Sequence, residues 1–562
     1  MTIFPERLKA IHAQTPDRVA VYLQFAGRED VPLTYEQLMC GATRFAQTLK
    51  REGIKPGEVV VLILQHGEDL VNSFWGAILH GAIPSIMPFL TEKLSPERYR
   101  ADLAALISVT RPSAIVTYPE FEADVRSALK EGDSVREVIL TNQLDEQVEF
   151  DLDALDGFTR TSDDIVLLQH SSGTTGLQKG VALSHQAVFN QLDAYAKALQ
   201  LTENDVIVSW LPLYHDMGLI AGFLLPILSG IPLVLSSPFD WVRAPYRLMQ
   251  SVSKYRGTLT WLPNFAYNFC AQKIRDRHIE GVDLSSWRAV INCSEPVRWE
   301  AHKAFYDFFQ KYGLKWEALQ TSYAMAENVF GVTQSRLGSS PAVVEVDRES
   351  FMVERLAKDP FDGRPSMKMM SSGFPLENVQ IKVLDENGHA VSDRVIGEVA
   401  LKSDCMLTGY FNRPDITEQA FRDGWYLTGD YGFLCDGELF VSGRRKDMII
   451  VGGKNVYPQD LEGLTYEVPG VHPGRSVAFG MFDESQGTEE VVIIAEVDSE
   501  DALEQQRVAD ALRAHVTKNS AIALRHVKVV GPKWIVKTSS GKTARSANKE
   551  KFLKELQESG TA

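Results

Sequence analysis

Short apolar runs alternate with amphipathic helical stretches along most of this chain, and this alternation constrains its fold more than any other feature. The run 59–64 is continuously apolar, as expected of a strand that is covered on both faces. Further candidate strands are 114–117, 137–141, 206–209, 233–235 and 289–292, and helical patterns such as 185–199 and 299–312 lie between them. Strands and helices that alternate in this way predict parallel α/β layers.

The pattern changes after about residue 375. The segments become shorter there and are separated by Asn-Gly, Asp-Gly and Gly turns, which predicts a smaller antiparallel sheet or barrel. A last unit follows the polar stretch 442–447, with the pattern helix, strand, strand, helix and basic tail. We therefore predict an α/β protein whose large N-terminal domain, residues 1–445, combines stacked α/β subdomains with a small barrel-like β subdomain. A small, mobile α+β domain, residues 446–562, follows it.

Composition excludes several classes of protein. The chain of 562 residues has 58 Lys and Arg against 74 Asp and Glu, a net charge of −16, which argues against a general nucleic-acid binder. Its five cysteines form no Cys-x-x-Cys pair, which argues against a disulfide framework or a structural zinc site. The longest apolar stretch, 219–235, is interrupted by Pro226, Gly230 and Pro232 and predicts buried helix, turn and strand rather than a membrane span. No signal-peptide pattern is present, so we expect a cytoplasmic protein.

A glycine- and hydroxyl-rich loop, 170–180 (HSSGTTGLQKG), follows a strand-like run and precedes a helix. Glycines let the backbone approach a polyanion closely, hydroxyl groups add hydrogen-bond donors, and a lysine adds positive charge. The loop is no Walker A motif, because no Gly-Lys-Ser/Thr ends it. The alternative is an ordinary surface turn. As phosphate ligands the loop offers Ser171, Ser172, Gly173, Thr174, Thr175, Gly176 and Lys179.

This loop resembles the phosphate loop of the AMP-forming adenylating, or acyl-activating, superfamily, which includes acyl-CoA synthetases, firefly-type luciferases, peptide-synthetase adenylation domains and fatty acyl-AMP ligases. Further motifs similar to those of the superfamily follow in the same order, namely Tyr323-Ala-Met-Ala-Glu327, Tyr426-Leu-Thr-Gly-Asp430, Gly443-Arg-Arg-Lys-Asp447 and Thr538-Ser-Ser-Gly-Lys542. The resemblance covers nearly the whole chain. It implies an enzyme that uses ATP to convert a carboxylic acid into acyl-AMP, with release of pyrophosphate.

The reaction brings two anions together, so positive charge has to be concentrated at the site. The resemblance implies that Lys542, which follows a glycine in a polar turn, bridges the carboxylate and the α-phosphate; the alternative is a solvated lysine in a basic tail. Glu327 is implied to bind Mg²⁺, which prefers oxygen ligands. Tyr323 is implied to stack on adenine. Asp430 suits two ribose hydroxyls, because an ionised carboxylate only accepts hydrogen bonds, and Arg444 is implied to hold the same ribose.

The remaining site residues also come from the resemblance. The segment 292–297 looks like the stretch that flanks adenine in the family. The implied nucleotide ligands from this segment are Asn292, Ser294, Glu295 and Pro296, and Ser322, which precedes Tyr323, is a further one. The implied acid-binding residues are Trp210, His215, Asp216, Met217, Ala324 and Met325, with His215 also a catalytic candidate near the carboxylate. Lys446 and Asp447 are the implied hinge about which the small domain rotates.

Three features are most similar to the fatty acyl-AMP ligases within the superfamily. They are the phrase 210–220 (WLPLYHDMGLI), the phrase 457–462 (YPQDLE), and a long spacer between Glu327 and Gly373. The spacer contains an insert, about 334–370, which in such ligases is thought to hamper the domain rotation needed to use free CoA. The alternative is a tolerated surface insertion, which costs little free energy.

The resemblance therefore implies transfer of the acyl group to the phosphopantetheine thiol of an acyl carrier protein, in lipid metabolism or in polyketide or natural-product biosynthesis. Open alternatives are free CoA as acceptor, adenylation of an amino or aryl acid, a luciferase-like oxygenase and a nucleotide sensor without chemistry. The sequence departs from the family pattern at His170, Cys293, Ser294, Ala324 and Val536. Cys293 and Ala324 narrow the space near the adenine or the carboxylate, which leaves a shorter, branched or functionalised acid open.

Overall fold

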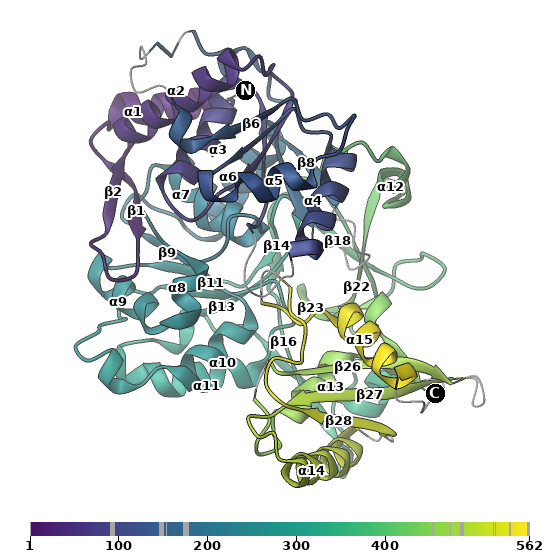
Figure 1. Cartoon of the computed structure of the whole chain (residues 1–562). Helices are drawn as coiled ribbons and strands as arrows, with labels where there is room; N and C mark the ends of the chain where they lie inside the picture. The colour runs from purple at the N-terminus through teal and green to yellow at the C-terminus, as the bar shows by residue number, and fades with distance from the viewer. Residues whose placement is uncertain are drawn as a thin grey trace.

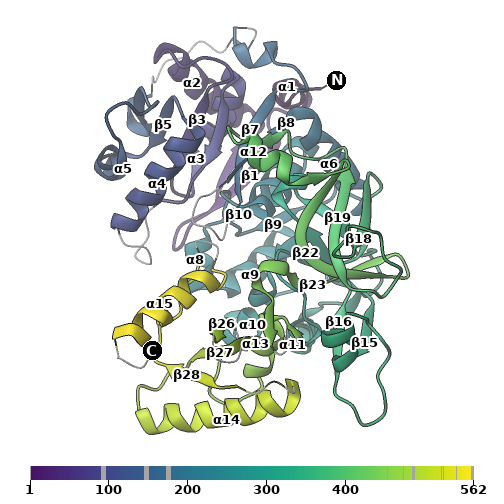
Figure 2. The same cartoon turned by 90° about the vertical axis from the view of Figure 1, so that its right-hand side faces the viewer.

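The computed structural model describes residues 2–89, 96–144, 151–152, 154–171, 179–451, 454–472, 474–483, 488–520, 522, 524–538 and 541–558. A large N-terminal body holds two α/β sheets and an antiparallel sheet, and a smaller C-terminal domain lies against it (Figures 1 and 2). This architecture confirms the predicted fold class.

The first sheet has the order β17-β14-β13-β12-β11-β9-β10-β1-β2. Its centre is parallel and consists of β13 (Leu319–Ala324), β12 (Ala289–Asn292), β11 (Leu259–Leu262), β9 (Ile207–Ser209), β10 (Leu233–Ser236) and β1 (Val19–Gln24). At its ends β2 (Val31–Thr34), β14 (Gly331–Gln334) and β17 (Phe374–Pro375) pair antiparallel. The parallel strands end at one edge of the sheet, and this edge carries the candidate site.

The second sheet has the order β20-β8-β7-β4-β3-β5-β6. Its strands are β3 (Val59–Ile63), β4 (Ile83–Ile86), β5 (Ala114–Thr117), β6 (Glu137–Leu140), β7 (Ile165–Ser171), β8 (Lys179–Ser184) and β20 (Gly409–Tyr410). Every residue of β3 is buried, as its continuous apolar run predicts. One apolar core reaches from Val60 of this sheet to Ile291 of the first, so the two sheets share a single core.

Helices connect and cover these two sheets. They are α1 (Phe4–Gln14), α2 (Tyr35–Arg51), α3 (Glu68–His80), α4 (Pro96–Thr110), α5 (Glu122–Ala128), α6 (His185–Ala198), α7 (Leu225–Ser229), α8 (Pro238–Arg243), α9 (Tyr246–Tyr255), α10 (Asn264–Lys273) and α11 (Trp299–Phe309). The apolar stretch 219–235 forms a π-helix (Met217–Leu224), α7 and β10, with Gly230 in the left-handed conformation between them (φ 74°). The buried helix, turn and strand predicted for it are thus confirmed.

The antiparallel sheet follows where the pattern changes. It consists of β18 (Val379–Leu384), β19 (Gly397–Ser403), β21 (Phe421–Arg422), β22 (Trp425–Cys435) and β23 (Glu438–Arg444), with α12 (Pro414–Gln419) beside it. The insert forms the hairpin β15 (Val343–Asp347) and β16 (Ser366–Met370). Between these strands, Phe351 contacts Phe433 and Tyr457, and Met352 belongs to an apolar cluster of the C-terminal domain.

The C-terminal domain consists of β24 (Ile449–Val451), β25 (Lys454–Val456), α13 (Pro458–Thr465), β26 (Ser476–Asp483), β27 (Thr488–Glu496), α14 (Ala502–Ser520), β28 (His526–Val530) and α15 (Arg545–Glu558). The prediction that the chain ends in a basic tail is wrong. The last segments are structured, because β28 pairs with β27 and Phe552 of α15 packs on Phe479. Only Asn548 and Phe552 of α15 are buried, so the helix has no apolar stripe that a pattern could detect. None of the described helices is long and apolar enough to span a membrane.

Candidate active site

A cavity of about 690 Å³ lies where the C-terminal domain meets the first sheet. Four neighbouring parallel strands supply part of its lining, each with a residue at or just beyond its carboxyl end: Ala324, Ser294, Pro263 and Trp210. Asp430 and Arg444 from the antiparallel sheet and Lys542 from the C-terminal domain also line the cavity. The crevice outside the carboxyl ends of parallel strands is the usual place for a ligand in such sheets.

Lys542 reaches this cavity from the other domain. Its ammonium group donates a 2.8 Å hydrogen bond to the carbonyl oxygen of Ser294. The preceding residue, Gly541, has a φ of 84°, a conformation that glycine adopts without steric cost. The turn thereby presents the lysine to the N-terminal body.

A second contact between the domains lies beside this one. Arg298, just before α11, donates a 2.7 Å hydrogen bond to Asp460 of α13. Their side chains are 25% and 15% exposed, so the pair is largely shielded from solvent. Within the C-terminal domain, Arg545 pairs with Glu462 at 2.7 Å and with Asp447 at 3.2 Å. The predicted hinge residue Asp447 is therefore tied to α15.

One acidic residue of the cavity wall is held by two neighbours. The Tyr323 hydroxyl donates a 2.5 Å hydrogen bond to Oδ2 of Asp430, and Nε of Arg444 lies 3.3 Å from Oδ1. Burial, followed by the charge of Asp430, raises the pKa of Tyr323 well above its ordinary value. The carboxylate thus stands in the wall in a fixed orientation. The Tyr323 side chain supports the Asp430 carboxylate. Tyr323 is not among the described residues that line the cavity.

A second acidic residue, Glu327, lies at the end of a short chain of two tyrosine hydroxyls. Tyr410 donates a 2.9 Å hydrogen bond to Oε1 of Glu327, and the Tyr410 and Tyr426 hydroxyls lie 3.0 Å apart. The Lys179 ammonium lies 4.7 Å from the centre of the Tyr410 ring. Burial raises the pKa of Glu327, and the hydrogen bond from Tyr410 acts against that rise. Among the described residues no three His, Cys, Asp or Glu side chains are grouped as a metal site.

His215 and Asp216 directly precede the π-helix on the apolar side of the cavity, and Asp216 caps that helix. Nε2 of His215 is buried and has no hydrogen-bond partner among the described residues. Burial, followed by the charge of Lys542, lowers the pKa of His215 to about 3, so its ring is neutral. Burial raises the pKa of Asp216, while the Lys542 ammonium acts against that rise. A buried nitrogen without a partner is costly unless a ligand satisfies it.

Several predicted residues lie behind the lining. Asn292 donates a 3.0 Å hydrogen bond to Asn264, Glu295 accepts one of 2.9 Å from the Phe265 amide, and Ser322 donates one of 2.7 Å to the Thr333 carbonyl. Of the predicted residues, those that do line the cavity are Lys179, Trp210, His215, Asp216, Met217, Ser294, Ala324, Met325, Glu327, Asp430, Arg444, Lys446 and Lys542.

The loop residues 172–178 and the side chain of Ser171 lie outside the described residues. The described lining also includes Gln169, His170, Glu398, Tyr410 and Thr428, which the sequence analysis did not assign to the site. His170 was visible as a departure from the family pattern, and Gln169 precedes it on β7. Glu398 and Tyr410 lie between the recognised motifs, and no sequence pattern around them marks them as site residues.

Residues 8–411, most of the N-terminal body, match the family described as AMP-binding enzyme. The chain belongs to the AMP-binding enzyme family. It is an ATP-dependent acyl-activating enzyme, and the resemblance on which the sequence analysis rests is confirmed. This AMP-binding enzyme is 31% identical over 551 residues to the long-chain-fatty-acid–AMP ligase FadD28 of Mycobacterium tuberculosis, covering 93% of this chain and 92% of that protein.

A second relative differs in the product that its name states. The medium-chain-fatty-acid–[acyl-carrier-protein] ligase JamA of Moorena producens is 29% identical over 563 residues, covering 96% of this chain and 93% of JamA. Among solved structures, a fatty acyl-adenylate ligase from a study of the Escherichia coli and Legionella pneumophila enzymes has a TM-score of 0.90 and 27% identity, covering 100% and 98% of the two chains. The Legionella pneumophila ligase in complex with acyl adenylate and pyrophosphate has a TM-score of 0.74 and 28% identity, covering 98% and 96%.

Proposed function

We propose that this AMP-binding enzyme activates a fatty acid with ATP and Mg²⁺ to fatty acyl-AMP and passes the acyl group to an acyl carrier protein. The observation that carries the proposal is the position of Lys542. Its ammonium group enters the cavity from a separate domain and is bound to the Ser294 carbonyl, between a wall with acidic residues and an apolar wall. An ammonium group there can reduce the repulsion between a carboxylate and a triphosphate.

In the first step, a carboxylate oxygen of the acid forms a bond to the α-phosphorus of ATP. The bond from that phosphorus to the bridging oxygen breaks, and pyrophosphate leaves with the electron pair. Lys542 contacts the developing negative charge, and Lys179, which also lines the cavity, contacts the leaving phosphates. The chain's contribution is to hold the two reactants in place and to neutralise their charge.

The nucleotide is held by the acidic wall. The fixed carboxylate of Asp430 accepts hydrogen bonds from the ribose hydroxyls, with Arg444 beside it, and Tyr323 holds Asp430 in place. The Glu327 carboxylate fits Mg²⁺, because that ion takes one or two protein carboxylates and completes its shell with phosphates and water. One oxygen of Glu327 is held by Tyr410, which orients the carboxylate. When bound, Mg²⁺ supplies positive charge to the phosphates.

The acid lies on the opposite side of Lys542. Trp210, Met217, Ala324 and Met325 offer apolar surface for its chain. The neutral ring of His215 has an unsatisfied Nε2, which fits a hydrogen bond near the reacting carboxylate. A neutral imidazole does not form a lasting ion pair with that carboxylate, so the acid remains free to react.

In the second step, the acceptor thiol loses its proton to solvent and its sulfur forms a bond to the acyl carbon. The bond from that carbon to the phosphate oxygen breaks, and AMP leaves with the electron pair. Lys542 has to move away to admit the thiol, which we assign to rotation of residues 446–562 about Lys446 and Asp447 against residues 1–445. The insert opposes this rotation, because Phe351 contacts the N-terminal Phe433 and also Tyr457. This double contact favours a protein acceptor, which gains binding energy from a large interface, over free CoA.

Exchange of labelled pyrophosphate into ATP tests the first step. We expect exchange that depends on a fatty acid and on Mg²⁺, and no exchange with any carboxylic acid would refute the adenylation chemistry. AMP release with a phosphopantetheinylated carrier protein or with free CoA then tests the acceptor. Faster release with CoA than with the carrier would refute the second half of the proposal while leaving the first intact.

A further inference from the structure

The apolar half of the cavity follows the edge of the first sheet. Ser294, Pro263 and Trp210 come directly after or just beyond β12, β11 and β9, which are consecutive neighbours, and all three line the cavity. Neighbouring strands lie about 4.8 Å apart, so two steps along the edge cover about 10 Å. Lys542 is bound at Ser294. A chain whose carboxylate is held there and that runs along the edge therefore meets Trp210 after about that length.

Trp210 is a firmly supported wall. Its ring stacks face to face on Trp241 of α8, with ring centres 3.5 Å apart and an angle of 2° between the planes. Phe265 meets both indoles edge-on, at 6.5 and 6.2 Å, and Phe269 lies 5.4 Å from Trp241. The two tryptophans are 4% and 2% exposed. Parallel rings at this distance leave no room for a methylene chain between them.

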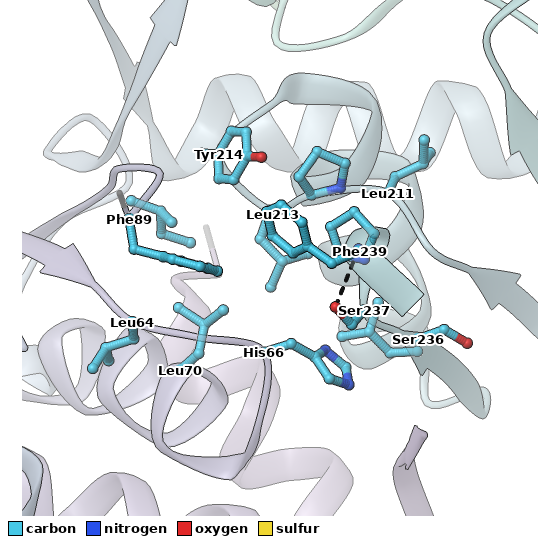
Figure 3. Close-up of a pocket in the computed structure, with 14 residues that line it drawn as sticks. Leu64, His66, Leu70, Phe89, Leu211, Leu213, Tyr214, Ser236, Ser237 and Phe239 are labelled. Carbon is cyan, nitrogen blue, oxygen red and sulfur yellow. Dashed lines mark hydrogen bonds between the residues drawn. The ribbon is translucent and has the colours of Figure 1, made fainter. Parts of the chain in front are cut away.

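A second space lies at the next strand. A cavity of about 40 Å³ is lined by Ser236, Ser237 and Phe239, where β10 ends and α8 begins, and its lining side chains are shown in Figure 3. It shares Leu211 and Pro212 with the large cavity. Since β10 neighbours β9, the small cavity continues the edge beyond Trp210. Trp210 lines the large cavity, and the residues that follow it, Leu211 and Pro212, line both cavities.

We infer that the stacked pair Trp210 and Trp241 limits the acid to a medium chain of about eight carbons. A carbon–carbon bond of about 1.5 Å advances an extended chain by roughly 1.3 Å, so about 10 Å accommodates about eight carbon atoms. Trp210 is the specificity-determining residue that meets the end of the chain. Trp241 is a positioning residue that holds Trp210 in place from behind. The inference rests on the proposed function and adds the chain length to it.

The test compares acid profiles of the full chain and two variants. Acid-dependent pyrophosphate exchange is measured for saturated acids of four to sixteen carbons with wild type, Trp241→Leu and Trp75→Leu. Trp75 is a matched control, because it is fully buried in α3 and its indole N–H, like that of Trp241, has no hydrogen-bond partner among the described residues. We expect kcat/KM of the wild type to peak near octanoate and to fall at least about tenfold by tetradecanoate.

Trp241→Leu is expected to raise kcat/KM for tetradecanoate relative to octanoate by about tenfold, and Trp75→Leu to leave that ratio unchanged. A folded Trp241→Leu protein with the wild-type ratio overturns the inference, as does a wild type that prefers hexadecanoate. Absence of exchange with every acid instead refutes the proposed function itself. Unreactive acyl-sulfamoyl adenosines of the same chain lengths test the wild type without any substitution. Equal inhibition by the eight- and fourteen-carbon compounds would also overturn the inference.

Discussion

The two walls of the cavity are built in different ways. On the N-terminal body, Asp430 and Glu327 are held by tyrosine hydroxyls, through hydrogen bonds of 2.5 and 2.9 Å within that body. On the C-terminal side, Lys542 is held by a hydrogen bond that crosses between the domains. The first arrangement persists whatever the domains do, and the second exists only while they are closed. We therefore expect nucleotide binding and chemistry to be separable in this molecule.

After substitution of Lys542 itself, we expect the largest loss of activity from substitution of Asp430 in the acidic wall. Asp430→Ala removes the proposed acceptor for the ribose hydroxyls and leaves Tyr323 and Arg444 without their carboxylate partner. We expect ATP affinity, measured by calorimetry, and pyrophosphate exchange to fall together by about 100-fold or more. Asp359→Ala is the control, because its side chain is 81% exposed and pairs with Arg394. Unchanged ATP affinity in Asp430→Ala would show that Asp430 does not bind the nucleotide.

If Glu327 binds Mg²⁺, the loss of activity on substituting it should depend on the Mg²⁺ concentration. Glu327→Gln keeps the shape of the side chain and an oxygen that can accept from Tyr410, but loses the negative charge. We expect exchange to fall about 30- to 100-fold at low Mg²⁺ and to recover in part at high Mg²⁺. The quantity to measure is the Mg²⁺ concentration that gives half-maximal exchange. If it is the same as in the wild type, Glu327 does not hold the metal.

The same residue predicts a pH dependence with a defined sign. Burial raises the pKa of Glu327 above its ordinary value, so the proton is bound at a higher pH than in an exposed glutamate. Because only the ionised form binds Mg²⁺ well, we expect Mg²⁺ affinity to fall as the pH drops through that raised pKa. The acidic limb should vanish in Glu327→Gln, and an acidic limb identical in both proteins would contradict this origin.

The contact between the domains gives a smaller effect. Arg298→Ala and Asp460→Ala each break the 2.7 Å pair and favour the open state. We expect each variant to lower exchange about tenfold with ATP affinity unchanged, and the double variant to be no slower than either, because the two residues act as one unit. Strictly additive losses in the double variant would show that the pair does not act as an interdomain latch.

The sequence could predict features that a local pattern marks, but not contacts between residues that are far apart in the chain. Continuous apolar runs such as 59–64 and 289–291 locate the buried parallel strands, because a strand covered on both faces needs them. Asp430, Arg444 and Lys542 each belong to a short sequence motif that can be recognised on its own, and the three residues meet in one cavity. The pairs Tyr410–Glu327 and Arg298–Asp460 carry no local signal, because each joins residues that are far apart in the chain. The polar helix α15 was missed for lack of an apolar stripe.

We assign Lys542 to adenylation and not to nucleotide binding or thiol transfer. The most direct measurement follows the two half-reactions of Lys542→Ala separately, with Lys554→Ala, whose side chain is 77% exposed, as control. We predict that pyrophosphate exchange falls about 1000-fold while ATP affinity and transfer from supplied acyl-AMP to the carrier thiol stay within about threefold of wild type. Exchange within tenfold of wild type in Lys542→Ala would contradict the account.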